Sequence, residues 1–114
     1  MPMIFKIIDA NAYDEARKHG QFMGAEIDLK DGYIHFSIAQ QVKETAQRHF
    51  LGRSNLVILA VDDAALGASL KWEPSRGGQL FPHLYSPLPM DKVKWVKPLP
   101  WGGTEHSFPP ETFA

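Results

Sequence analysis

The chain has 114 residues, of which 44% are hydrophobic and 22% charged, as in an ordinary globular protein. Its net charge is −1, so tight, non-specific nucleic-acid binding is not expected. The absence of cysteine excludes disulfides, thiolate nucleophiles and cysteine-ligated zinc. No apolar run reaches the length of a signal peptide or a membrane span, which predicts a cytoplasmic protein with no membrane partner.

The N-terminal half predicts two helices separated by short strands. Asp9 and Gly20 delimit the first helix, because an acidic residue suits a helix start and glycine suits the position after its end. Ser37 and Gln40 match a capping box at the start of the second, amphipathic helix. The predicted elements are a strand at 3–8, a helix at 9–19, a hairpin-type turn at 28–32, a strand at 33–36 and a helix at 38–50.

The C-terminal half predicts strands and loops. Its most apolar run, 55–61, is too short for a helix and is expected to form a central strand. Further strands are predicted at 70–73, 83–86 and 92–97, with a flexible loop at 75–78. Two main helices and about six strands in mixed order indicate an α+β fold with split sheets. We expect a single domain, residues 1–114, with its core at about 3–99 and an irregular tail at 100–114.

Two short segments each place a histidine two residues before a hydroxyl group. Because residues i and i+2 of a strand share a face, His35 is expected beside Ser37, and His83 beside Tyr85. A core strand does not favour such pairs, since each buried polar group costs about 1–3 kcal/mol when it lacks a partner. Two pairs in one small protein predict a polar cleft, and the helix start after Ser37 favours an anion beside His35.

Glu73 and Arg76 lie between these two pairs in sequence, near a strand end. The Glu73 carboxylate can accept a proton or stabilise a developing cation, and Arg76 with the glycines after it can wrap a phosphate. Each candidate also has a structural interpretation: a helix cap for Ser37, a satisfied core histidine for His35, a surface carboxylate for Glu73, an ordinary turn for Arg76, and a fixed strand register for His83. No ligand spacing such as His-x-x-x-His supports a metal site, and none is predicted.

Several separated motifs resemble the family known as domain of unknown function 952. They occur in order over nearly the whole chain and comprise residues 4–7, 31–37, 41–42, 45–46, 70–78 and 80–85. That family is similar in fold to the ADP-ribosyltransferases, whose split, mixed sheets hold NAD in a cleft. The resemblance implies that His35 positions a ribose, that Tyr85 stacks on nicotinamide and that Glu73 stabilises the ribosyl cation. Glu73 precedes Tyr85 in this chain, whereas the transferases have the reverse order.

The first hypothesis of function is an enzyme that handles NAD or another nucleotide. It transfers or hydrolyses an ADP-ribosyl or phosphoribosyl group, with NAD entering as a substrate and no cofactor assigned. Its catalytic residues are Glu73 and His35, and its binding residues are Ser37, Arg76, His83 and Tyr85.

Two further hypotheses make the protein non-catalytic. In one, the cleft is a module that binds a nucleotide or another small anion without turnover. In the other, the motifs are structural: the histidines bond to the backbone, and an exposed Trp95 or Trp101 supports formation of a homo-oligomer.

Overall fold

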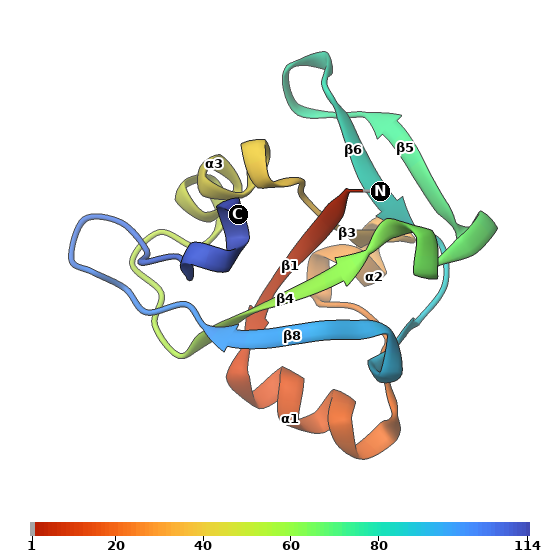
Figure 1. The fold of residues 1–114 in the computed structure, drawn as a ribbon, viewed down its shortest axis with the longest axis horizontal. Coiled ribbons are helices and arrows are strands. Elements are labelled where there is room, and N and C mark those ends of the chain that lie inside the picture. The colour runs from red at the N-terminus through yellow and green to blue at the C-terminus, as the bar shows by residue number, and fades with distance from the viewer. Residues whose placement is uncertain (1) are drawn as a thin grey trace.

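The structure is a computed structural model that describes residues 2–114. It contains three antiparallel sheets built from short strands. The strands are β1 (Met3–Asp9), β2 (Gln21–Phe22), β3 (Ile34–His35), β4 (Leu56–Asp62), β5 (Leu70–Pro74), β6 (Leu80–Leu84), β7 (Leu88–Pro89) and β8 (Val93–Pro98). The largest sheet has the order β1-β4-β8, so the most apolar strand, β4, is central as predicted (Figure 1). The two smaller sheets have the orders β3-β6-β5 and β2-β7.

The helices of residues 2–114 are α1 (Ala10–His19), α2 (Glu26–Asp31) and α3 (Ala39–His49). The two long helices, α1 and α3, were both predicted, and with the small antiparallel sheets they give the predicted α+β class. Gly20 ends α1 in the left-handed conformation, with φ 79°, as expected of a glycine after a helix. None of the helices within the described residues combines the length and the apolar character that crossing a bilayer would need.

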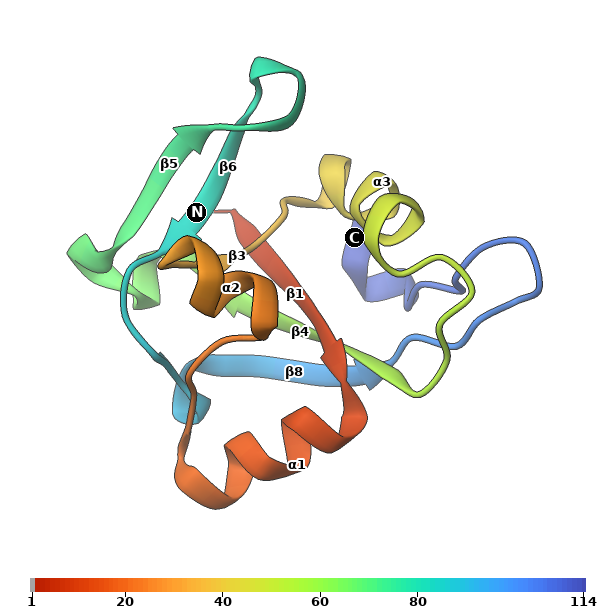
Figure 2. The ribbon, with the colours of Figure 1, turned by 180° about the vertical axis from the view of Figure 1, so that it is seen from behind.

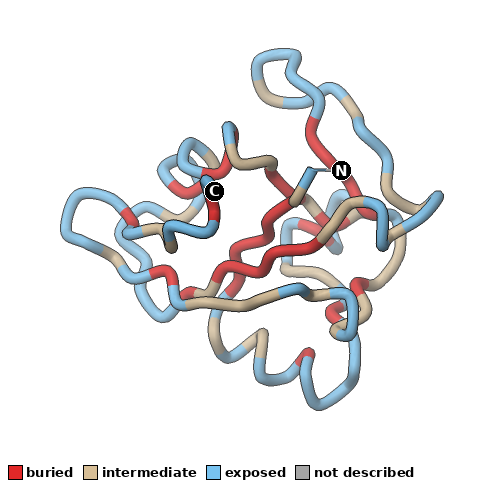
Figure 3. Tube along the Cα trace, viewed as in Figure 1, coloured by how far each residue is buried: buried red, intermediate tan, exposed pale blue. Residues whose placement is uncertain are grey.

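The core lies on both faces of β1 and β4, where burial is concentrated (Figure 3). Along β1, side chains alternate between faces: Phe5 and Ile7 pack in the cluster that contains α3, while Ile4 and Ile8 pack in the other. Lys6 shares the face of Ile4 and Ile8, so the alternation carries its side chain into the interior, where only 6% of the residue is exposed. A buried ammonium group needs an anionic partner, and this requirement shapes the site described below.

The sheet β3-β6-β5 positions most of the predicted site residues. In its ladders His35 is paired directly with His83, and Lys71 is paired with His83 from the other side. Glu73 lies two residues beyond Lys71 and therefore shares a sheet face with it and with His83. The β5–β6 hairpin projects from the body of the molecule in both views, with α2 and β3 lying near its base (Figure 2).

The predicted turn at 28–32 is wrong, because residues 26–31 form α2. Gly32 does have a positive φ, of 89°, but it ends a helix instead of turning a hairpin. The Asp-Gly signal is ambiguous for this reason, since glycine serves the left-handed position in both structures. The strand that follows α2 is correspondingly short: β3 covers only Ile34 and His35 of the predicted 33–36.

The predicted capping box of Ser37 and Gln40 is also wrong, by one residue. The helix start is at Ile38, whose backbone N–H donates to Gln41 Oε1 at 3.1 Å. An isoleucine side chain has no acceptor, so only this half of a capping box is made. The Ser37 hydroxyl is instead 2.8 Å from Thr45 Oγ1 on the next turns of α3, which leaves Ser37 facing the interior and not the helix end.

Candidate functional site

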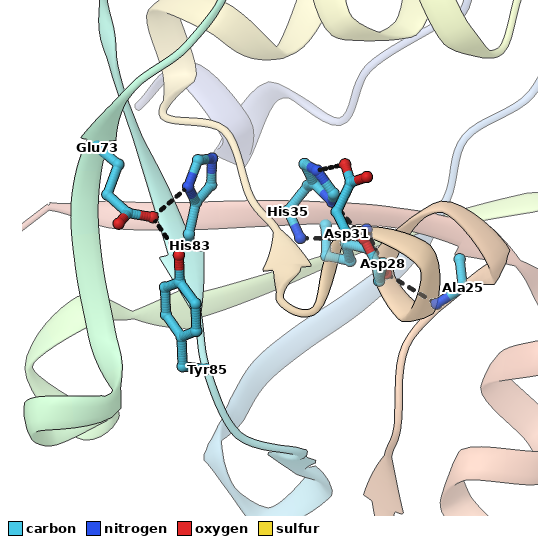
Figure 4. A network of polar contacts seen from close by, with 8 residues as sticks. Ala25, Asp28, Asp31, His35, Glu73, His83 and Tyr85 are labelled. Carbon is cyan, nitrogen blue, oxygen red and sulfur yellow. Dashed lines mark hydrogen bonds and ion pairs between the residues drawn. The ribbon is translucent and has the colours of Figure 1, made fainter.

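Glu73, His83 and Tyr85 form a hydrogen-bonded group on the β5–β6 hairpin. One carboxylate oxygen, Glu73 Oε1, accepts from His83 Nδ1 at 2.7 Å and from the Tyr85 hydroxyl at 2.8 Å (Figure 4). The hydrogen bond from His83, and next that from Tyr85, lower the pKa of Glu73, and the same contact raises the pKa of Tyr85. Because the ionised carboxylate only accepts, His83 carries its proton on Nδ1 toward Glu73. In the neutral ring, Nε2 is then free to accept a proton.

Tyr33 joins this group to His35. Its ring stacks on His83 with centroids 4.1 Å apart, and lies 4.6 Å from the ring of His35 and 5.2 Å from that of Tyr85. Burial, and then the negative charges of Asp31 and Glu73, raise the pKa of the Tyr33 hydroxyl. The rings of His35 and His83 meet edge to face, 5.6 Å apart. Four predicted site residues, His35, Glu73, His83 and Tyr85, therefore lie in one connected cluster.

Asp28 fixes the other side of His35. Its carboxylate is 1% exposed and accepts from His35 Nδ1 at 2.7 Å, from the backbone N–H of His35 at 3.1 Å and from that of Ala25 at 2.7 Å. Lys6 Nζ completes the group, 2.9 Å from Asp28 Oδ2. Burial opposes ionisation of Asp28, but the His35 hydrogen bond, the charge of Lys6 and the amide of Ala25 together bring its pKa down to about 2. Burial lowers the pKa of Lys6, and Asp28 opposes that change.

Ser37 and Arg76 meet at Thr45 of α3. Thr45 Oγ1 donates its one proton to the carbonyl of Gln41 at 3.1 Å, so it accepts from Arg76 at 3.2 Å and from the Ser37 hydroxyl. The guanidinium of Arg76 also lies 3.1 Å from Glu44 and 4.9 Å from the centre of the Phe81 ring. With only 20% of its side chain exposed, Arg76 is held in place on three sides.

A cavity of about 890 Å³ adjoins His35, Ser37 and Arg76. Its polar lining includes four cations, Lys6, Arg48, Arg53 and Arg76, together with His35, His49, Ser37 and Thr45; its acidic lining is Asp9 and Glu26. The aromatic lining is Phe5, Phe36, Phe50 and Phe81. The size is that of a small-molecule site, and the excess of cations over acids on its wall suits an anionic ligand with an apolar part.

Each of the four cations of this cavity has a carboxylate partner: Lys6 pairs with Asp28, Arg53 with Asp9, and Arg48 and Arg76 both with Glu44. Arg53 lies 2.9 Å from Asp9 and Arg48 lies 2.8 Å from Glu44, but these side chains are about half exposed, so each pair contributes little and can open. Burial, and then the charge of Arg76, lower the pKa of His49 on the same wall.

The predicted site residues thus separate into two groups. His35, Ser37 and Arg76 line the cavity, whereas Glu73, His83 and Tyr85 do not. His35 belongs to both groups, through its place on the cavity wall and its contacts with Tyr33 and His83. Among residues 2–114, no set of three or more histidine or acidic side chains is arranged to hold a metal ion.

Sequence reasoning did not identify Lys6, Asp28, Tyr33 and Thr45 as site residues. A lysine inside the apolar run 3–8 was a usable signal, since a buried ammonium demands a carboxylate. The partner is Asp28, 22 residues away, and no local pattern links the two. Tyr33 lies two residues before His35 and so obeys the same i, i+2 rule that selected Ser37 and Tyr85.

The structural hypothesis expected the motif histidines to bond to the backbone and Trp95 or Trp101 to be exposed, and the structure differs on both points. The polar partners of the His35 and His83 rings are carboxylates, whereas His106 Nε2 is 2.8 Å from the backbone carbonyl of Arg53. Trp95 and Trp101 are half-buried, with Trp95 packed in the cluster around α3 and Trp101 edge to face with His106. His106 therefore serves as the structural histidine against which His35 and His83 can be compared.

The fold is thus of the α+β class, with small antiparallel sheets and two histidines bound to carboxylates. The chain belongs to the family described as Protein of unknown function (DUF952), which matches residues 7–96. This confirms the family resemblance noted from the sequence motifs. No match is found among proteins with curated descriptions.

Solved structures of protein CC0527 from Caulobacter crescentus are similar to this chain over nearly its whole length. The crystal structure is 41% identical, with a TM-score of 0.94 over 98% of this chain and 99% of that one. The solution NMR structure is 44% identical, with a TM-score of 0.83 over 93% of this chain and 91% of that one. The fold described above is therefore also found in an experimentally solved relative.

Proposed function

We propose that this protein binds a small phosphorylated ligand of the nucleotide class in the cavity and transfers or hydrolyses its ribosyl or phosphoribosyl group beside Glu73. NAD is a candidate substrate through the resemblance to the ADP-ribosyltransferases. The observation that carries the proposal is the double position of His35: it lines the cationic cavity and its ring lies 5.6 Å from that of His83. A ligand held in the cavity thus has one end near the Glu73–His83 pair.

The two groups of side chains have separate roles in this proposal. Arg76, held by Thr45 and Phe81, attracts the phosphate, because a guanidinium forms paired hydrogen bonds with phosphate oxygens. The aromatic wall, of which Phe50 and Phe81 are part, covers the base or nicotinamide. Ser37 and His35 hold the sugar and phosphate oxygens between these ends.

The chemistry is assigned to Glu73 and His83. When the bond between ribose C1′ and the leaving nitrogen breaks, the electron pair departs with nitrogen and C1′ becomes cationic; the Glu73 carboxylate stabilises that charge. An acceptor hydroxyl or water then forms a C1′–O bond, and its proton passes to His83 Nε2, since Nδ1 is donated to Glu73 at 2.7 Å. Tyr85 restrains the same carboxylate oxygen from the exposed side.

An NMR titration tests binding, and a product assay tests turnover. Backbone and imidazole resonances are followed while NAD, ADP-ribose, AMP and nicotinamide are added to millimolar concentration; shifts at His35 and Arg76 are expected. Release of nicotinamide from NAD is then measured by chromatography for the wild type, for Glu73→Gln and for Glu111→Gln. Glu111 is the control, because it is a partly exposed carboxylate outside the cavity lining, held by one side chain, Lys97 at 2.6 Å. An absence of shifts with every ligand would refute the proposal.

A second candidate is the non-catalytic binding module, and one observation favours it. Glu73, His83 and Tyr85 do not line the cavity, so a ligand can fill it without touching them. Saturable binding without nicotinamide release, with affinity unchanged in Glu73→Gln, supports the module and excludes the enzyme. Loss of turnover in Glu73→Gln at unchanged affinity supports the enzyme.

A further inference from the structure

The second ring nitrogen of His35 also faces a carboxylate, that of Asp31. The distance from Nε2 to Asp31 Oδ2 is 3.0 Å, and that from Nδ1 to Asp28 Oδ1 is 2.7 Å. A carboxylate accepts hydrogen bonds and does not donate them when ionised, so both ring nitrogens donate in this arrangement. The His35 ring therefore lies between two carboxylates, one at each ring nitrogen, as Figure 4 shows.

These two carboxylates are held very differently. Asp28 is 1% exposed, receives four hydrogen-bond donors or cations and has a pKa of about 2, so it cannot leave His35 without stranding Lys6. Asp31 is 35% exposed on its side chain, and within residues 2–114 the polar contact recorded for its carboxylate is the one with His35. Asp28 is a fixed partner, and Asp31 is a replaceable one.

The position of Asp31 in its helix also makes it easy to replace. It is the last residue of α2, directly before Gly32. The carbonyl end of a helix disfavours a negative charge, so Asp31 gains nothing from its own helix. Ion pairs as exposed as that between Asp31 and His35 contribute little, because water competes for both partners.

We propose that Asp31 occupies the place that an anionic oxygen of the ligand takes on His35, and that it acts as a built-in competitor for that place. The inference rests on the proposed function of the cavity, since His35 lines that cavity together with Ser37 and Arg76. An incoming phosphate or carboxylate oxygen replaces Asp31 on Nε2, while Asp28 keeps the ring oriented through Nδ1. Asp31 holds the ring in a binding-competent orientation until that exchange.

Removing the competitor should strengthen binding, which is the opposite of what removal of a binding residue does. Asp31→Ala removes the hydrogen-bond partner of His35 Nε2, and Asp31→Asn leaves a neutral and weaker acceptor in its place. We expect the affinity for AMP and inorganic phosphate to rise about two- to fivefold in Asp31→Ala and by less in Asp31→Asn, which corresponds to the strength of one exposed ion pair. Acetate, as a carboxylate probe, distinguishes a general anion site from one specific for phosphate.

Asp14→Asn is the matched control, because Asp14 is an exposed aspartate on α1 and its loss changes the net charge equally. Dissociation constants are measured by NMR titration, and the His35 ring resonances report directly whether the added anion reaches Nε2. Equal or weaker binding in Asp31→Ala than in the wild type refutes the competitor role of Asp31. The proposal that the cavity binds anions is not affected by that result. Equal gains in Asp14→Asn and Asp31→Ala also refute the competitor role, since the effect is then one of net charge. If no anion binds to any of these proteins, the proposed function itself fails, and the competitor with it.

Discussion

His35 and His83 are direct partners across the β3–β6 ladder, and in each residue Nδ1 is hydrogen-bonded to a carboxylate oxygen at 2.7 Å. The two carboxylates differ: Asp28 is buried beneath Lys6, while Glu73 is one-third exposed on the β5–β6 hairpin. The carboxylate that orients His35 is thus buried, while the one that orients His83 can be reached by solvent and ligand. The rings show the reverse order, with 31% of the His35 side chain exposed and 4% of the His83 side chain. This asymmetry supports a positioning and binding role for His35 and a proton-transfer role for His83.

Replacement of Asp28 by asparagine should be the most destabilising change at the site. It leaves the ammonium of Lys6 buried without its anion and weakens the contact with His35, so we expect a loss of about 3–5 kcal/mol in the free energy of unfolding. Asp9→Asn breaks the exposed pair with Arg53 and should cost no more than about 1 kcal/mol. Urea denaturation of both variants checks the contrast, and equal losses would contradict it.

The same carboxylate predicts how stability depends on pH. The pKa of Asp28 is about 2 in the folded protein, whereas an unperturbed aspartate, as in the unfolded chain, has a pKa of 3.8. The unfolded chain therefore binds the proton more readily. Its stabilising contribution, about 2 kcal/mol, is therefore fully present above about pH 4 and is lost as the pH falls through 2. The free energy of unfolding measured between pH 5 and pH 2 should fall less steeply in Asp28→Asn than in the wild type. Parallel curves would assign the acid sensitivity to other groups.

Arg76 should contribute more to anion binding than an arginine outside the cavity. Arg76→Ala removes a guanidinium that Thr45 and Phe81 hold in place, so we expect the affinity for AMP to fall about tenfold or more. Arg76→Lys should restore only part of it, because an ammonium cannot pair with two phosphate oxygens at once. Arg17→Ala, on α1 beside Tyr13, is the control and should leave the affinity unchanged. Calorimetric titration with AMP measures all four proteins.

Two glycines around Asp28 test how the local backbone positions His35. Gly32 has φ 89° with open space where a Cβ would stand, so Gly32→Ala should cost about 1 kcal/mol through backbone strain alone. A Cβ on Gly24, with φ 126°, would meet Asp28 Cβ at 3.0 Å. Gly24→Ala should therefore cost more and also shift the NMR resonances of the His35 ring, whereas Gly32→Ala should leave them closer to wild type. The reverse order would show that Asp28 does not depend on this close approach.

Regular elements with strong local signals could be predicted from the sequence. The run 55–61 became the central strand because it is uniformly apolar, and the helix over 38–50 followed from its amphipathic spacing. The Asp31-Gly32 pair failed as a hairpin signal, since the choice between hairpin and helix end involves contacts of Asp28 with His35, seven residues on, and with Lys6, 22 residues before it. Tertiary contacts decided between two local structures that glycine permits equally.

The candidate site was predictable where strand alternation determines it. His83 and Tyr85 do reach the same carboxylate oxygen, that of Glu73, as the i, i+2 relation predicts, although β6 itself ends at Leu84. Ser37 departs from the rule: the ladder ends at His35, and Ser37 is drawn to Thr45 on α3. A polar cleft and a role for Arg76 were predicted, but Arg48 and Arg53 were not, since only the fold brings these two stretches of the chain to one wall.

Tyr33 should act as a positioning residue for His83. Its ring stacks on the imidazole at 4.1 Å, so Tyr33→Leu should free the ring to rotate, whereas Tyr33→Phe keeps the stack and loses only the hydroxyl. Ring-current shifts of the His83 protons measure the stack directly: they should persist in Tyr33→Phe and disappear in Tyr33→Leu. If nicotinamide release occurs, kcat should fall in Tyr33→Leu and recover in Tyr33→Phe, with KM little changed, because His83 lies outside the cavity lining. Loss of the ring-current shifts in both variants would instead mean that the Tyr33 hydroxyl holds the ring in place.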